Sequence, residues 1–284
     1  MLKDYELKRK ETFEEVIKML EEEKDNIIEL FDRLLYAQCN PITKTIYKGY
    51  NRLLLNSLAI RNNLTDNRWL TFNQIKNNNW KLKKGSKSIK IEKWSMFSPK
   101  DEKDKENKSL IPFLKYFDIF NAKDIEGIPE KPINEYKPDI YDIISEQFKE
   151  TAKIQIIERD DFTPYFDKDL KYIKMPLKIQ FKEPKLYLKT LVSLLSLDIA
   201  QNENKELRGI YKISREDYNK LLSELSTIII FKDFNFDIKG NLFKEFSNSL
   251  KKWLPIFKDD YRTLYGTIKD AQEISDLVMK NYNN

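Results

Sequence analysis

Apolar residues recur at helical spacing near the start of the chain. Between residues 12 and 37 they stand three or four positions apart, at Phe13, Val16, Ile17, Leu20, Ile27, Phe31 and Leu34. This spacing predicts one helix, with Thr12 and Glu15 as a capping box at its start and Asn40-Pro41 after its end. A second helix is predicted over residues 50–60, and a short one over 69–75 with Thr71 as a candidate cap.

The period then changes from helical to alternating. Residues 88–94 and 114–120 alternate apolar and polar side chains, which predicts two strands of a small antiparallel sheet. The stretch between them, residues 99–108, is almost entirely charged, so we expect a solvated loop that joins the two strands.

The second half is mostly helical in pattern. Helices are predicted over residues 140–152, 186–200, 218–231, 242–257 and 261–282, with a short strand at 172–176. Because residues 228–230 are all β-branched, the end of the helix predicted over 218–231 could instead be extended. The fold class is therefore α+β. We expect a first domain over residues 1–128, a proline-marked linker over 129–138, and a second domain over 139–284.

The residue types limit the chemistry. The chain has no histidine, which excludes serine–histidine, cysteine–histidine and H-E-x-x-H catalysis. A lone Cys39 excludes an internal disulfide framework. An enzyme that uses carboxylates alone remains open, with the doublets Asp160-Asp161 and Asp259-Asp260 as its candidate acids. Acidic doublets are common on surfaces, and nothing spaces these as a metal site.

Positive charge is concentrated in one region. Residues 44–100 contain thirteen lysines and arginines, opposed only by Asp66 and Glu92, whereas the rest of the chain is net acidic. Such asymmetry predicts a module that faces a polyanion. No apolar run approaches the ~18–20 residues of a membrane span, and the charged first residues lack a signal core. We therefore expect a cytoplasmic protein without a membrane partner.

Three segments of the first half resemble the N-terminal domain of ArdC-type antirestriction proteins. The first is N-P-I-T-K-T-I-Y-K-G-Y-N-R-L-L-L at 40–55. The second is R-W-L-T-F-N-Q-I-K at 68–76, followed by W-K-L-K-K-G-S-K-S at 80–88. The third is K-Y-F-D-I-F-N-A-K-D-I-E-G-I at 115–128. Two glycines of the family pattern are replaced here, by Lys44 and Asn79, so we expect the local turns to differ.

The resemblance implies binding of single-stranded DNA, and the residue types suit that role. Lysines around Gly85 can neutralise phosphates, and aromatic faces can stack unpaired bases. The candidate binding residues are Tyr47, Lys48, Asn51, Arg52, Arg68, Trp69, Thr71, Gln74, Lys81, Lys83, Lys84, Lys87 and Asn121. Trp80 and Tyr50 are two further aromatic residues on which bases could stack. The alternative for each is structural: tryptophans usually pack cores, and Asn51, Gln74 and Asn121 can satisfy backbone groups at turns.

The second half resembles the zinc-metallopeptidase domain of the same family more weakly. Its segments are T-P-Y-F-D at 163–167, I-K-M-P at 173–176, Y-L-K-T-L at 187–191 and W-L-P-I-F-K-D-D at 253–260. Laid on this pattern, H-E-x-x-H falls on Ser193-Leu194-Leu195-Ser196-Leu197. Active members need two imidazoles for zinc and a glutamate as base. The resemblance therefore implies a degenerate domain with no catalytic residue, metal or cofactor, in which the leucines fill the vacated cleft. Glu224 is either a remnant of the third-ligand region or an ordinary surface residue.

The leading hypothesis is a non-catalytic antirestriction protein of a phage or mobile element that binds single-stranded nucleic acid, with DNA favoured over RNA. The alternative is an inhibitor of a host defence effector, such as a restriction or CRISPR nucleoprotein. In that case the protein acts through protein–protein or guide-RNA contacts.

Overall fold

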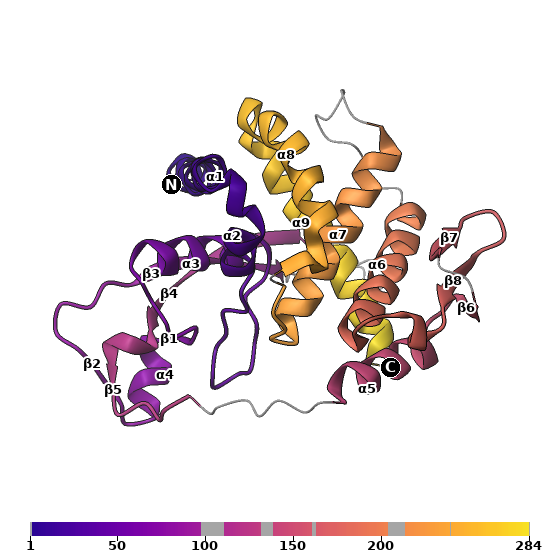
Figure 1. Ribbon diagram of the computed structural model, residues 1–284. Helices are drawn as coiled ribbons and strands as arrows, with labels where there is room; N and C mark the ends of the chain where they lie inside the picture. Colours follow the sequence, from indigo (N-terminus) through magenta and orange to yellow (C-terminus); the bar gives the residue numbers. More distant parts are fainter. Residues whose placement is uncertain are drawn as a thin grey trace, which may run out of the picture. The chain divides into compact units, whose positions relative to one another are not determined.

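The computed structural model describes residues 2–97, 111–131, 139–160, 163–203, 214–238 and 240–283. The chain divides into two compact units: residues 37–132 form one, and residues 1–36 together with 133–284 form the other (Figure 1). Helices dominate, and three small sheets accompany them. The expected α+β class is confirmed. No helix in the described ranges is long and apolar enough to cross a membrane.

The unit of residues 37–132 is built on a three-stranded sheet in the order β1-β4-β3, antiparallel throughout. Its strands are β1 (Trp69–Thr71), β3 (Ile89–Phe97) and β4 (Ile111–Asn121). A two-stranded sheet pairs β2 (Lys81–Leu82) with β5 (Ile125–Glu126). Helices α3 (Gly49–Arg61) and α4 (Phe72–Asn77) and the short 3-10 helix η2 (Ala122–Asp124) complete it.

Two apolar clusters hold this unit together. The larger joins α3 to the sheet through Tyr47, Leu55, Trp69, Ile91 and Ile119, all at most 9% exposed. The smaller packs α4 against β1 and β5 through Ile75, Leu70 and Ile125. Because side chains alternate between the two faces of a strand, Ile119 packs on the larger cluster whereas the next residue, Phe120, packs on the smaller one.

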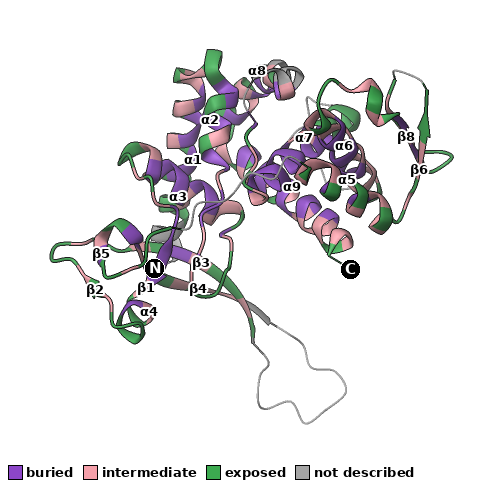
Figure 2. Cartoon of the chain, turned by 60° about the horizontal axis from the view of Figure 1, so that its bottom comes forward, coloured by how far each residue is buried: buried purple, intermediate pink, exposed green. Residues whose placement is uncertain are grey.

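The other unit is a helical assembly around α6 (Pro184–Asn202), α7 (Arg215–Asp233) and α9 (Tyr261–Tyr282). Helix α7 is buried on most of its surface, and the buried faces of the three helices are visible in Figure 2. Around them lie α1 (Leu2–Glu22), α2 (Ile27–Leu34), α5 (Ile140–Thr151) and α8 (Lys244–Asp259). A small mixed sheet has the order β6-β8-β7, with β6 (Gln155–Arg159), β7 (Tyr165–Asp167) and β8 (Tyr172–Pro176).

The N-terminal helix differs from the prediction of one helix starting at Thr12. Helix α1 already runs from Leu2, and a 3-10 turn at Lys24–Asn26 separates it from α2. Thr12 lies inside α1, where its hydroxyl donates to the carbonyl of Lys8 at 2.9 Å instead of capping a helix start. The charged run before residue 12 hid the first turns, because exposed helical turns carry no apolar period.

The first 36 residues also pack differently from the expected 1–128 domain. The Phe13 ring lies edge-on to Tyr265 of α9, with ring centroids 5.5 Å apart. Asp32 of α2 accepts from the Lys232 ammonium of α7 at 2.6 Å. These contacts assign residues 1–36 to the unit that contains the C-terminal helices, because an amphipathic helix packs wherever a complementary apolar face is available.

Two further predictions in the second half are corrected or extended. Residues 228–230 are helical and at most 1% exposed, so the extended alternative is wrong. Strands β6 and β7 were not predicted, since each is short and largely exposed or half-buried. The expected loop at 99–108, and most of the linker at 129–138, lie outside the described residues.

Candidate nucleic-acid interface

Three segments that are distant in sequence line one groove of about 600 Å³ in the unit of residues 37–132. They are the C-terminal end of α3, the turn between β2 and β3, and η2. The cationic residues that line the groove are Arg61, Lys83, Lys84, Lys87 and Lys123. Among the described residues that line it, Asp124 is the acidic one. The groove is therefore strongly electropositive.

The turn that carries the lysines is held in place by its own hydrogen bonds. The Lys83 backbone N–H donates to the carbonyl of Asp124 at 2.9 Å, and its ammonium donates to the carbonyl of Lys123 at 2.6 Å. Ser86 Oγ donates to the carbonyl of Lys83 at 2.7 Å. Gly85 adopts a φ of 86°, a conformation that other residues reach only with strain. Figure 2 shows the turn largely exposed.

The floor of the groove is apolar. Leu58, Leu64 and Ile89 are half-buried and line it beside one edge of Trp69. Leu64 and Ile89 pack on the core cluster that contains Trp69. The groove thus combines a charged rim with an aliphatic floor.

All five lysines predicted to bind nucleic acid are exposed, but only three of them line the groove. Lys83, Lys84 and Lys87 line it, whereas Lys48 and Lys81 are exposed outside it. Lys48 precedes the first turn of α3, and Lys81 lies in β2.

Both arginines of the candidate set are buried and engaged within the protein. Arg68 is 9% exposed, and its guanidinium contacts both carboxylate oxygens of Asp66 and donates to the carbonyl of Pro129 at 2.7 Å. Arg52 is 1% exposed, and its Nε donates to the carbonyl of Tyr47 at 3.2 Å. Neither side chain is accessible to a phosphate, which corrects the prediction for these two residues.

The aromatic residues predicted to stack bases are largely internal. Trp69 is 2% exposed, and its Nε1 donates to Gln38 Oε1 at 2.6 Å. Tyr47 is 9% exposed, and burial raises the pKa of its phenol. Half-buried Trp80 packs against Gly127 and the smaller apolar cluster. For Trp69 and Tyr47 the structural alternative holds: their rings form the core rather than base platforms.

The polar members of the set also serve the fold. The Asn51 side chain bonds both backbone groups of Glu92, at 2.6 and 2.9 Å, and so covers the edge of β3. Thr71 and Gln74 form a capping box at the start of α4, as the Thr71 cap was predicted. Asn121 is 3% exposed, and its Nδ2 donates to the carbonyl of Asp66 at 2.8 Å.

Sequence reasoning missed two cations of the groove. Arg61 lies at the end of α3, outside the segments that carried the resemblance, and Lys123 lies two positions after Asn121 in the third segment. The position of Lys123 in that segment was the available signal. No comparable local signal pointed to Arg61, because only tertiary packing brings the end of α3 beside the lysine turn.

The two residues that replace family glycines keep a glycine-like backbone. Lys44 and Asn79 each have a φ of 59°. Asparagine tolerates this left-handed region, whereas lysine is strained there. Both positions thus have the left-handed backbone that glycine favours.

In the second unit, the segment aligned with H-E-x-x-H packs against α7. Ser193 Oγ lies 3.3 Å from Glu224 Oε1, to which it donates, and the Lys189 ammonium lies 3.1 Å from the same oxygen. Ser223 Oγ donates to the carbonyl of Ser193 at 2.6 Å. Leu194, where the catalytic glutamate would stand, is half-buried.

The carboxylate of Glu224 and the hydroxyls beside it do not form a ligand set for a divalent metal ion. Glu224 Oε1 is already bound by an ammonium, Oε2 is buried without a hydrogen-bond partner, and the neighbouring hydroxyls are neutral and weak ligands. Within the described ranges, no three residues among histidine, cysteine, aspartate and glutamate are grouped to hold a metal. The Lys189–Glu224 ion pair supplies the local charge balance instead.

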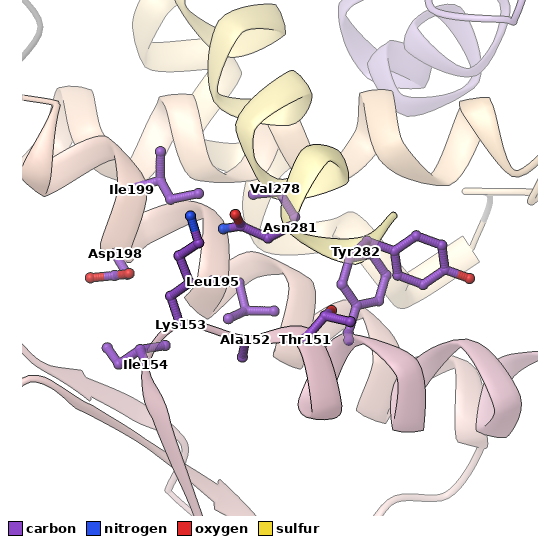
Figure 3. A pocket seen from close by; sticks show the side chains of 11 residues that line it. Thr151, Ala152, Lys153, Ile154, Leu195, Asp198, Ile199, Val278, Asn281 and Tyr282 are labelled. Atoms are coloured by element: carbon purple, nitrogen blue, oxygen red, sulfur yellow. The ribbon is translucent and has the colours of Figure 1, made fainter. Parts of the chain in front are cut away.

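Beside Leu195 of the same segment, the structure leaves only a small space. Leu195 lines a cavity of about 30 Å³ between α5, α6 and α9, together with Ile199, Val278 and Tyr282 (Figure 3). Burial raises the pKa of Asp198 at this cavity. A space of this size holds roughly one water molecule, so it cannot admit a peptide side chain.

The acidic doublets occupy ordinary positions where the structure describes them. Asp160 accepts from the Gln180 amide at 2.9 Å, and Asp260 caps the start of α9 by accepting from the Arg262 N–H. Asp259 is exposed, and Asp161 lies outside the described residues. The three described residues of these doublets do not belong to any group of acidic residues that could hold a metal ion.

The fold and the groove define a two-unit α+β protein with an electropositive groove in the unit of residues 37–132. Residues 8–120 match the family model of the N-terminal domain of anti-restriction factor ArdC. No curated protein matches the chain. Two crystal structures of the antirestriction protein ArdC from plasmid R388 share its fold. The metal-free one has a TM-score of 0.62 and 21% identity, over 92% of this chain and 96% of that one. The Mn(II)-bound one has a TM-score of 0.66 and 20% identity, over 96% and 98%. Residues 8–120 are thus similar to the ArdC N-terminal domain, and the chain shares the fold of ArdC.

Proposed function

We propose that this ArdC-type protein is a non-catalytic antirestriction protein of a plasmid, phage or other mobile element, which binds single-stranded DNA in the host cytoplasm. The observation that carries the proposal is the groove, where cations from α3, the β2–β3 turn and η2 converge. Lysines and arginines on one concave surface bind phosphates with little dependence on base sequence. Bound in this way, the protein shields the entering strand.

The preference for DNA follows from the family, not from a contact to the sugar. The matched N-terminal domain, residues 8–120, contains four of the five groove cations, and Lys123 follows it closely. The two crystal structures of similar fold are both of the antirestriction protein ArdC from plasmid R388. These similarities support the antirestriction role.

The absence of catalysis is part of the proposal. It is supported by Ser193 and Leu197 at the positions of the two zinc-binding imidazoles, by Leu194 at the position of the base, and by the absence of histidine from the whole chain. The Lys189–Glu224 ion pair adds a permanent positive charge where a metal would need free acceptors. We therefore expect no peptidase activity.

A titration of labelled oligonucleotides at several salt concentrations tests the binding role. We expect affinity for single-stranded DNA that falls steeply as salt rises, because each phosphate contact releases a counterion. Duplex DNA and RNA of the same length are measured alongside. Weak affinity that is flat with salt would contradict the proposal.

The second candidate is an inhibitor of a restriction or CRISPR effector, and one surface favours it. Trp94 and Met96 are 60% and 64% exposed on the same face of β3. Exposed aromatic and methionine side chains are typical of protein contacts. A stable complex between this protein and a purified effector, formed without nucleic acid and lost in a Trp94→Ala variant, would favour the inhibitor over strand shielding.

A further inference from the structure

The basic groove has a layered chemistry that phosphate binding alone does not require. Its rim carries Lys83, Lys84, Lys87 and Lys123, whereas its floor is formed by the half-buried aliphatic side chains Leu58, Leu64 and Ile89. Phosphates gain nothing from an aliphatic surface, because burying an ion there costs solvation. The floor therefore suits the uncharged part of a ligand whose charged part meets the rim.

The size of the groove sets the scale of that ligand. A volume of about 600 Å³ lies within the range of pockets that enclose small molecules and cofactors. A base with its sugar is of this class, whereas a duplex hides the faces of its bases in the stack and presents only base edges, sugars and phosphates. A base reaches the floor only after it leaves its neighbours in the stack.

The groove is also preformed. The Lys83 backbone and ammonium are both bound to η2, at the carbonyls of Asp124 and Lys123, and Ser86 closes the turn onto Lys83. Leu64 and Ile89 rest on the core cluster. A surface that is ordered before binding loses less conformational entropy when it binds.

We propose that the groove takes one unstacked nucleotide of a single strand. The base packs on Leu58, Leu64 and Ile89, and the flanking phosphates contact the lysine turn and Lys123. This inference rests on the proposed function, since it names what the strand-binding site holds. Because Trp69 is 2% exposed, the base contact is aliphatic and not an aromatic stack.

The test compares two ten-nucleotide oligomers with the same phosphates. One is dT10, and the other carries abasic tetrahydrofuran sites throughout. We expect dT10 to bind the full-length protein at least about tenfold more tightly, near the lower end of measured base contributions. Equal affinity for the two would overturn the one-nucleotide inference and leave strand binding intact. If neither oligomer bound, the proposed function would fail as well.

A matched pair of variants assigns the effect to the floor. Leu64→Gln keeps the side-chain size but makes the floor polar, whereas Leu114→Gln changes a half-buried leucine of β4 outside the groove. We expect Leu64→Gln to reduce the gap between the two oligomers, which is the ratio of their affinities, to less than about threefold, a third of the wild-type ratio. Its affinity for the abasic oligomer should not change, which also shows that the variant is folded. A gap that stayed at the wild-type value in Leu64→Gln, or narrowed equally in Leu114→Gln, would overturn the assignment.

Discussion

The Arg68 guanidinium grips Asp66 with two nitrogens, Nε at 2.9 Å and Nη2 at 2.7 Å, and the backbone N–H of Arg68 donates to the same carboxylate at 3.0 Å. The arginine that the sequence placed among the DNA-binding residues is therefore a structural residue. It fixes the segment that leads into β1, and its third nitrogen holds the carbonyl of Pro129.

Substitution of Arg68 by alanine should lower stability and leave binding unchanged. Removing the guanidinium leaves the Asp66 carboxylate with only the backbone N–H of residue 68 and the carbonyl of Pro129 without its side-chain donor, at a cost of about 2–3 kcal/mol in the free energy of unfolding. Urea denaturation measures this loss. Oligonucleotide affinity, measured well below the unfolding transition, should stay within about threefold of wild type, a difference below 1 kcal/mol. A large loss of oligonucleotide affinity in a variant that stays folded would show that Arg68 contributes to binding.

The same pair predicts how stability depends on pH. Burial opposes ionisation of Asp66, but the hydrogen bonds and charge of Arg68 outweigh it and hold the pKa of Asp66 below the ordinary aspartate value of 3.8. A lowered folded pKa contributes stability that is present above the unfolded pKa and is lost as pH falls through the folded one. We expect the stability difference between wild type and Asp66→Asn to be constant near neutral pH and to shrink below about pH 4. Urea titrations across this pH range measure it, and a difference that grew on acidification would contradict the sign.

The triple variant Lys83→Ala, Lys84→Ala, Lys87→Ala tests the rim of the groove. If each lysine contacts one phosphate, the slope of log affinity against log salt should become shallower by about 2. Affinity near 0.1 M salt should decrease on the order of a hundredfold. The control variant Lys10→Ala, Lys18→Ala, Lys220→Ala removes the same charge from exposed i,i+4 ion pairs on helices of the other unit. Equal losses in the two variants would reduce the effect to net charge.

The Lys189–Glu224 pair predicts the response to metal ions. We expect Mn(II) and Zn(II) to leave the melting temperature of the wild-type protein unchanged. A metal ion that bound the folded protein, at a concentration of a hundred times its Kd, would raise the free energy of unfolding by about 2.7 kcal/mol and so raise the melting temperature. Lys189→Met should destabilise by about 1–3 kcal/mol, because it strips a largely buried carboxylate of its cation. Adding Glu224→Gln to that variant should recover part of the loss. Stabilisation of the wild type by either ion would refute this interpretation.

Lys44 offers a stabilising substitution. Its φ of 59° strains a lysine, so Lys44→Gly should raise the free energy of unfolding by up to about 1 kcal/mol, after the greater entropy of unfolded glycine is subtracted. Asn79→Gly, at the same φ, is the matched comparison and should gain less, because asparagine tolerates this region. Thermal denaturation of both variants separates them, and a loss of stability in Lys44→Gly would show that the turn is not strained.

The sequence by itself determined the features that depend on a few neighbouring residues. Alternation located β3 and β4, the Thr71 cap followed from its place before α4, and Gly85 marked the turn that carries the lysines. The loss of histidine needed no structure at all. These signals survive without tertiary information because strand period, capping and backbone freedom are local properties.

Tertiary structure decided which of the candidate side chains reach solvent. Arg68 and Trp69 have the residue types of a DNA-binding surface, yet each found a buried partner, in Asp66 and Gln38. The same long-range packing brought Arg61 beside the lysine turn and carried residues 1–36 to the C-terminal helices. Burial is a property of the assembled core, because it depends on which distant surfaces meet, and a local pattern does not contain that information.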